Sequence, residues 1–124
     1  MKSNILMDFP YLQKNKGLVF LDSASTSQKP KAVLDALQAY HESYCSNVHR
    51  GAYRLSARAT DAYEGARQAV ADFIGAPCAE SCIFTRGTTE SINNLACTLG
   101  PGLIGAGDAI VLTPMEHHSN LVPW

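Results

Sequence analysis

One group of residues that could do chemistry is the segment TRGTTE at residues 85–90. A glycine allows a tight turn, and a helix that begins directly after it offers unpaired N–H groups and a partial positive charge to an anion. The hydroxyl groups of Thr88 and Thr89 would add two donors, so the segment is compatible with a phosphate site. A Gly-Thr turn is a short motif, however, and a threonine that only caps its own helix is the competing interpretation.

A second polar segment, EHHSN at residues 116–120, directly follows an apolar run at residues 109–113. In open α/β sheets, ligands bind beyond the carboxyl ends of the strands. A histidine ring there offers a flat face for stacking on an aromatic ligand and a nitrogen that exchanges protons near neutral pH. Because residues 85–90 also follow a predicted strand, we expect both segments at one edge of a sheet. The alternative is an exposed loop with two incidental histidines.

A third segment, NVHRG at residues 47–51, places a histidine and an arginine before a glycine. Such a pair can bind a carboxylate, but the spacing alone favours a surface loop. His41, Cys45 and His49 are four residues apart, and both residue types are good zinc ligands. A zinc site needs three or four converging ligands, and the helix is expected to end before His49, so no metal site is predicted.

Alternating apolar segments predict the elements that must position these residues. Short apolar runs are typical of buried strands, which are expected at residues 18–21, 81–85 and 109–113. Apolar side chains at three- and four-residue steps predict helices at residues 30–44, 60–74 and 89–99. Thr60 is the expected N-cap of the second helix and Gly75 its expected end, and the segment Gly100-Pro101-Gly102 is expected to end the third. Strands that alternate with helices predict an α/β fold, with a mostly parallel sheet and flanking helices.

The composition narrows the classes of function. The chain has 124 residues, of which 46% are hydrophobic and 17% charged, and its net charge is −1, as in globular proteins. Nucleic acids and anionic membranes call for a basic surface, so neither is expected as a partner. There is no secretory signal and no run of about 20 apolar residues, so we expect a soluble, cytoplasmic protein. The apolar ending LVPW suggests a cut inside a larger domain.

The motifs occur in the same order in the SufS-type cysteine desulfurases, which are class V aminotransferases, and the chain resembles them from about residue 18 onward. The segments TRGTTE and MEHHSNLVPW are highly specific in combination. The shared motifs are LDSA at 21–24, QKP at 28–30, NVHRG at 47–51, ATDAYE at 59–64, FTRGTTESIN at 84–93 and MEHHSNLVPW at 115–124.

The resemblance implies an enzyme of fold type I that depends on pyridoxal 5′-phosphate (PLP) and forms a homodimer. Residues 1–17 would be an N-terminal segment, and residues 18–124 would be part of the large PLP-binding domain. The implied reaction removes sulfur from L-cysteine, which leaves L-alanine and a persulfide on an enzyme cysteine. An acceptor protein then takes the sulfur for iron–sulfur cluster assembly. PLP acts as the electron sink, and the protein supplies position and electrostatics.

The resemblance also implies roles for cofactor-side residues of this chain. Thr88 and Thr89 resemble the pair that binds the phosphate of PLP. His117 resembles the histidine that stacks on the pyridine ring and assists proton transfer.

On the substrate side, His49 resembles a histidine that lines the substrate pocket near the dimer interface. Ala24 lies in a segment that resembles the substrate-side loop of the family. Many members have a second alanine after it, and Ser25 is a departure that adds a hydroxyl group.

Several residues that the family requires have no counterpart here. Its Schiff-base lysine lies downstream of the EHH motif, as do the aspartate that pairs with the pyridine nitrogen, the arginine that binds the substrate carboxylate and the persulfide cysteine. The chain is therefore interpreted as an N-terminal fragment. Another class V PLP lyase or epimerase, and a non-enzymatic domain that binds a phosphorylated small molecule, are the alternatives. The lysines and cysteines that do not match are Lys2, Lys14, Lys16, Lys29, Lys31, Cys45, Cys78, Cys82 and Cys97.

The chain by itself is expected to have no desulfurase turnover, because it offers no matching lysine for the cofactor. The measurement is release of alanine from L-cysteine in the presence of PLP, compared with a heat-treated sample. Alanine release above that control would contradict the expectation.

Overall fold

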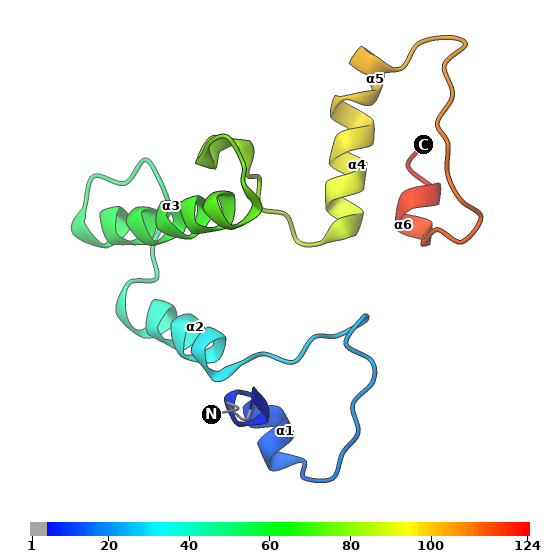
Figure 1. Cartoon of the computed structure of the whole chain (residues 1–124). Coiled ribbons are helices and arrows are strands. Elements are labelled where there is room, and N and C mark those ends of the chain that lie inside the picture. Colours follow the sequence, from blue (N-terminus) through cyan, green and yellow to red (C-terminus); the bar gives the residue numbers. More distant parts are fainter. Residues whose placement is uncertain (1–4) are drawn as a thin grey trace. The chain divides into compact units, whose positions relative to one another are not determined.

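The computed structural model describes residues 5–124, and all of their regular secondary structure is helical (Figure 1). The chain divides into two compact units, Met1–Ala66 and Arg67–Trp124. The described part of the first unit contains a 3₁₀ helix at Ile5–Asp8, α1 at Pro10–Lys14, α2 at Lys31–Ser43 and the first part of α3, which spans Arg54–Ile74. The second unit contains the end of α3, a 3₁₀ helix at Ala79–Ser81, α4 at Thr88–Thr98, α5 at Gly100–Leu103 and α6 at His118–Leu121.

The predicted parallel sheet is not present among residues 5–124. Residues 18–21, 82–85 and 109–113 have no regular secondary structure, and Ser81 belongs to a 3₁₀ helix. A strand satisfies its backbone N–H and C=O groups only by pairing with another strand, and no two of these segments form a ladder in the described part of the chain. The apolar runs were therefore recognised, but their predicted conformation is not adopted in this chain.

The helix predictions agree with the structure at two places and fail at others. The helices expected at residues 30–44 and 89–99 are α2 and α4, each within one residue at both ends. The predicted end of the third helix before Gly100 agrees with the structure, because α4 ends at Thr98. The short α5 then begins at Gly100, with Pro101 in its first turn, and was not predicted. Proline is tolerated there, because N–H groups in the first turn of a helix have no acceptor within the helix, so the N–H that proline lacks is not needed. The short helices α1 and α6 were not predicted.

The start of α3 corrects the prediction that Thr60 is an N-cap. The helix begins at Arg54, so Thr60 lies inside it. The Thr60 hydroxyl donates to the carbonyl of Ser56 (2.8 Å) and accepts from the backbone N–H of His49 (2.9 Å). The Ser56 hydroxyl donates to the carbonyl of Asn47 (2.8 Å). These hydroxyls hold a preceding loop against the helix and do not cap it.

The predicted stop at Gly75 is confirmed, and its geometry explains it. Gly75 has φ +70°, a left-handed conformation that side chains disfavour. The N–H of Ala76 donates to the carbonyl of Ala71 (2.9 Å), and the N–H of Gly75 donates to the carbonyl of Asp72 (3.3 Å). This pair of bonds is a Schellman motif, which satisfies carbonyls that the helix end leaves unpaired.

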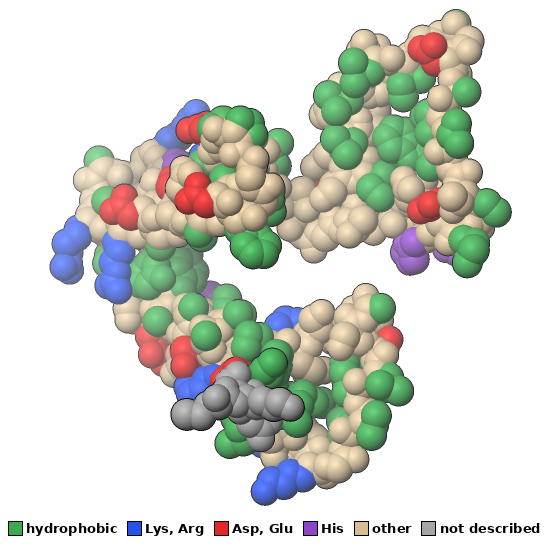
Figure 2. Space-filling view, in the orientation of Figure 1, with side chains coloured by type: hydrophobic (Ala, Val, Ile, Leu, Met, Phe, Trp, Pro, Cys, Tyr) green, Lys and Arg blue, Asp and Glu red, His purple; other side chains and the backbone are tan. Residues whose placement is uncertain are grey.

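Little of the apolar surface is covered in either unit. The buried residues of the described chain are small, namely Ser56, Ala59, Ala71, Ala79 and Cys82. Apart from Cys82, the apolar side chains of the predicted strands are exposed or only half-buried, for example Leu21, which is 88% exposed, and Val111, which is 92% exposed. Figure 2 shows hydrophobic side chains on the surface of both units. Within residues 5–124, every helix is too short or too polar to cross a lipid bilayer.

Two glycines, Gly65 inside α3 and Gly75 directly after its end, are expected to respond to alanine in opposite directions. Gly75→Ala would place a side chain in a left-handed conformation and lower helix stability by about 1 kcal/mol. Gly65→Ala should raise it by about 0.5–1 kcal/mol, because Gly65 lies inside the helix with open space around it. Far-UV circular dichroism during urea unfolding measures both, and changes of the same sign would contradict the Schellman end.

Candidate functional site

The turn before α4 is held by side chains other than the two threonines of interest. Glu90 accepts a hydrogen bond from the backbone N–H of Arg86 (2.6 Å). The hydroxyls of Thr85 and Ser91 lie 2.7 Å apart, and each donates to the carbonyl of Gly87 at 3.3 Å. The backbone of the turn is therefore positioned by hydrogen bonds from Glu90 and Ser91 of α4 and from Thr85 of the turn itself.

Thr88 and Thr89 are the first two residues of α4, and Gly87 stands at the N-cap without a side-chain cap. Neither threonine hydroxyl makes a hydrogen bond to any residue in the described range 5–124. The structure therefore does not have the threonine cap that was the competing interpretation. Two hydroxyl donors and the free N–H groups of an 11-residue helix are left at its positive end.

His117 stands at the N-cap of α6, and its side chain makes the cap. Its Nδ1 atom accepts from the backbone N–H of Ser119 (3.2 Å) and lies 2.9 Å from the Ser119 hydroxyl. Because Nδ1 acts as an acceptor, the proton of the neutral ring is on Nε2. A cap of this kind fixes the orientation of the imidazole.

Thr89 and His117 come together at one pocket of the second unit. This pocket has a volume of about 280 Å³, and an adjoining hollow of about 460 Å³ is lined by the turn before α4. Thr89 and Asn93 line both, whereas Thr88 lines neither. The residues lining the smaller pocket are Thr89, Asn93, His117, His118, Ser119, Val122 and Pro123.

Sequence reasoning missed two residues that organise this pocket. Asn93, one turn after Thr89, donates from its amide to the carbonyl of Thr89 (2.7 Å). Glu116 accepts from the Thr113 hydroxyl (2.8 Å) and from the Asn120 amide (3.1 Å). The four-residue spacing of Thr89 with Asn93 and of Glu116 with Asn120 is the signal that could have found them.

The two hydrogen bonds to Glu116 also set its protonation. Donation by Asn120 first, and by Thr113 second, lowers the pKa of the Glu116 carboxyl below its usual value. Asn120 in turn accepts from the indole N–H of Trp124 (3.0 Å). The segment that carries His117 is thus held at both ends by one ionised carboxylate.

In the first unit, His49 is bound to α3. Its Nε2 atom lies 2.7 Å from a carboxylate oxygen of Glu64, and its ring meets Tyr63 edge to face with centroids 5.8 Å apart. His49 was predicted as a substrate-side residue, and Glu64 was not singled out as its partner. The spacing of residues 47–51 predicted a surface loop, and His49 and Arg50 do lie in an exposed loop. This loop is also bound to α3 through hydrogen bonds of His49.

Ala24 lies in an exposed turn of the first unit. The N–H groups of Ser25 and Thr26 both donate to the carbonyl of Asp22, at 3.2 Å and 2.9 Å. The other predicted site residues, Thr88, Thr89 and His117, belong to the second unit.

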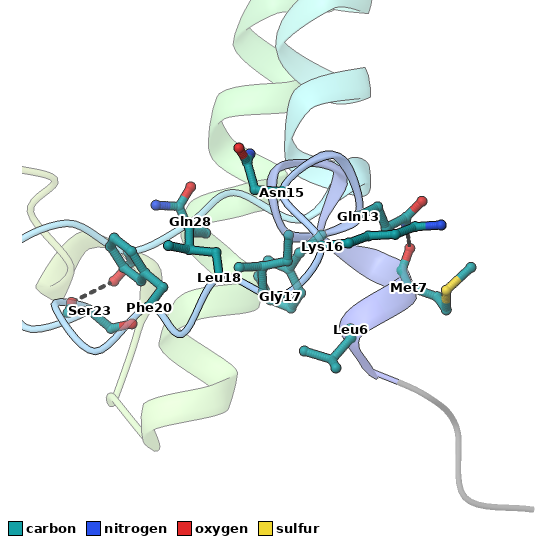
Figure 3. Close-up of a pocket in the computed structure, with 13 residues that line it drawn as sticks. Leu6, Met7, Gln13, Asn15, Lys16, Gly17, Leu18, Phe20, Ser23 and Gln28 are labelled. Carbon is teal, nitrogen blue, oxygen red and sulfur yellow. Dashed lines mark hydrogen bonds between the residues drawn. The ribbon is translucent and has the colours of Figure 1, made fainter.

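Another pocket lies in the first unit and contains none of the predicted site residues (Figure 3). It has a volume of about 830 Å³ and lies between the N-terminal helices and the loop that follows them. Its lining is mostly apolar, with Lys16 as the charged residue. In residues 5–124, no three His, Cys, Asp or Glu side chains gather in a way that would hold a metal ion.

The family model for class V aminotransferases matches residues 19–124. With that match over most of its length, the chain belongs to the class V aminotransferase family. Within the family it is similar to proteins named as probable cysteine desulfurases. The relative from Halalkalibacterium halodurans is 55% identical over 119 residues, which cover 94% of this chain and 29% of the relative. The relative from Synechocystis sp. is 53% identical over 98% of this chain and 30% of its own length.

A solved structure supports the same relationship. The apo structure of a cysteine desulfurase from Thermococcus onnurineus NA1 matches with a TM-score of 0.87 and 44% identity. The match covers 100% of this chain and 30% of that one. The chain thus spans about a third of the length of the proteins that it matches.

The carboxylate of Glu116 is expected to control the end of the chain in acid. The pKa of Glu116 is lower in the folded chain than in the unfolded chain, where it is about 4.3. Its hydrogen bonds therefore stabilise the structure fully at pH values above that unfolded pKa, and this stabilisation is lost as the pH falls through the lower folded pKa. Trp124 is the only tryptophan, so its indole N–H signal in NMR spectra reports the change.

The indole signal should shift with a midpoint below about pH 4.3, and Glu116→Gln should abolish that shift. Glu42→Gln, in the exposed part of α2, should leave it unchanged. A midpoint above about 4.3, or a Glu116→Gln variant that behaves like the unaltered chain, would contradict this role.

Proposed function

We propose that this chain forms part of the PLP-binding domain of a cysteine desulfurase. The observation that carries the proposal is the pocket in which Thr89, at the start of α4, and His117, at the start of α6, lie together. The similarity to cysteine desulfurases at 55% and 53% identity supports the same assignment. The proposed reaction of the complete enzyme takes sulfur from L-cysteine and leaves L-alanine and an enzyme persulfide.

The donor groups at the start of α4 fit the phosphate of PLP. A phosphate needs hydrogen-bond donors and positive potential, and the Thr88 and Thr89 hydroxyls lie at a helix N-terminus where both are available. The ring of His117 would stack on the pyridine, and its cap on α6 would hold it in place. Bound PLP would supply an electron sink for the carbanion chemistry.

The exposed apolar segments support the placement of residues 18–124 in a large domain with a parallel sheet. Val19, Ile83 and Val111 are 76%, 80% and 92% exposed, although their neighbours in sequence are also apolar. Covering each of these side chains would contribute about 1.5–3 kcal/mol. We infer that further strands of a longer protein cover them, and that residues 1–17 precede this domain.

On the substrate side, we propose that His49 and Ala24 line the L-cysteine pocket. The contacts of His49 with α3 support this role. They hold both its backbone and its ring, so the orientation of the side chain is set before a ligand binds. A homodimer, a sulfur-acceptor protein of iron–sulfur cluster assembly and a cytoplasmic location complete the proposal. These follow from the similarity to cysteine desulfurases.

The experiment compares PLP with pyridoxal, which lacks the phosphate, by NMR titration of the purified chain. Thr89→Val should weaken PLP binding by about tenfold or more and leave pyridoxal binding unchanged, because it removes a hydrogen bond to a charged group. Thr98→Val, at the other end of α4, is the matched control and should change neither.

A second variant separates the ring contact from the phosphate contact. His117→Asn retains a good N-cap residue but removes the aromatic face, so it should weaken PLP and pyridoxal to the same extent. Equal PLP binding by the unaltered chain and Thr89→Val would refute the phosphate site at α4.

A further inference from the structure

The backbone at His49 and Arg50 is in a conformation that such residues rarely adopt. Their φ angles are +61° and +47°, and they are the two residues other than glycine with positive φ in the described chain. Such a conformation is strained in an L-residue, because it brings Cβ too close to the following carbonyl oxygen. A conformation of this kind persists only when surrounding contacts determine it, and it is common where a side chain must be aimed.

Those contacts come from one stripe of α3. The Thr60 hydroxyl accepts from the N–H of His49 (2.9 Å), and Ser56, one turn earlier, donates to the carbonyl of Asn47 (2.8 Å). Asn47 also donates from its amide to the carbonyl of His49 (3.0 Å). Gly51 permits the close approach, because a Cβ atom there would lie 2.0 Å from the Ser56 hydroxyl oxygen.

The same stripe continues to the ring of His49. Tyr63 meets the ring edge to face, and Glu64, one turn after Thr60, places a carboxylate oxygen 2.7 Å from Nε2. The His49 side chain is 53% exposed and that of Glu64 is 34% exposed. The imidazole therefore remains accessible to a small molecule, while its partner is more covered.

We propose that Glu64 is the positioning residue for His49. An ionised carboxylate only accepts hydrogen bonds, so the proton of the neutral ring lies on Nε2, between the two side chains. Nδ1, which has no hydrogen-bond partner within residues 5–124, then presents its lone pair in a fixed direction. This lone pair accepts a hydrogen bond from the ammonium or thiol group of an amino acid such as L-cysteine.

The direction of Nδ1 rests on the observed contacts alone, whereas its ligand rests on the proposed function. The two parts are tested by different measurements. The arrangement itself has a spectroscopic signature in the chain without any ligand. A ring N–H that donates to a carboxylate exchanges slowly with water, so it gives a resolved NMR signal that a freely solvated ring does not give.

The first experiment records the ring N–H signal of His49 in the ¹⁵N-labelled chain. The unaltered chain should show a slowly exchanging Nε2–H, Glu64→Ala should lose it, and Glu64→Gln should restore it because its side-chain oxygen also accepts. Asp61→Ala is the matched control, since it removes an exposed carboxylate from the same helix. Circular dichroism confirms that α3 remains folded in each variant.

The second experiment measures desulfurase kinetics of the longer protein that contains this chain. Glu64→Ala should lower kcat/KM for L-cysteine by about tenfold, and Glu64→Gln should recover most of it. A ring N–H on Nδ1, or an Nε2–H signal that Glu64→Ala leaves intact, would overturn the positioning role whatever the activity. If the signal behaves as expected and no variant affects kcat/KM, the ligand assignment of Nδ1 is overturned and the PLP site at α4 is unaffected.

Discussion

The need to satisfy backbone hydrogen bonds decides which parts of this chain have regular structure. In a helix each N–H finds a carbonyl four residues earlier, so α2, α3 and α4 form from contacts within single segments. A strand has no such internal partner. The apolar runs at residues 18–21 and 109–113 therefore have no ladder in the described chain, and side chains such as Val111 stay exposed.

Side chains on the helices then determine the shape of the loops that carry the candidate site residues. The hydroxyls of Ser56 and Thr60 bind backbone groups of the loop before α3, and Glu90 binds the backbone before α4. At the end of the chain, by contrast, Glu116 and Asn120 bind each other side chain to side chain next to α6. In the first two cases a polar side chain satisfies a backbone group of the loop that would otherwise need water, and the loop that carries His49 or the turn before Thr88 and Thr89 is positioned as a result.

The residues at the starts of α4 and α6 and the loop that carries His49 can be compared with what a class V aminotransferase would need to bind. In the proposed function, the positive end of α4 and the capped ring of His117 would take a ligand that is anionic at one end and aromatic at the other, which is the chemistry of PLP. In the same proposal, the His49 loop would meet the small polar substrate, with Glu64 orienting the ring through the 2.7 Å contact to Nε2. The two sets of residues lie in different units of the chain.

The sequence by itself determined the features that depend on neighbours within one or two turns. The spacing of apolar residues located α2 and α4, Gly75 marked the end of α3, and the motif at residues 85–90 identified the turn before a helix. It could not determine whether the apolar runs would become strands, because pairing depends on partners far away in the chain. Only the tertiary structure showed that Thr60 binds the loop at His49 rather than capping a helix, since these residues are 11 positions apart. The partnership of His49 with Glu64, across 15 positions, was hidden for the same reason, because loop geometry brings such residues together and no local pattern encodes it.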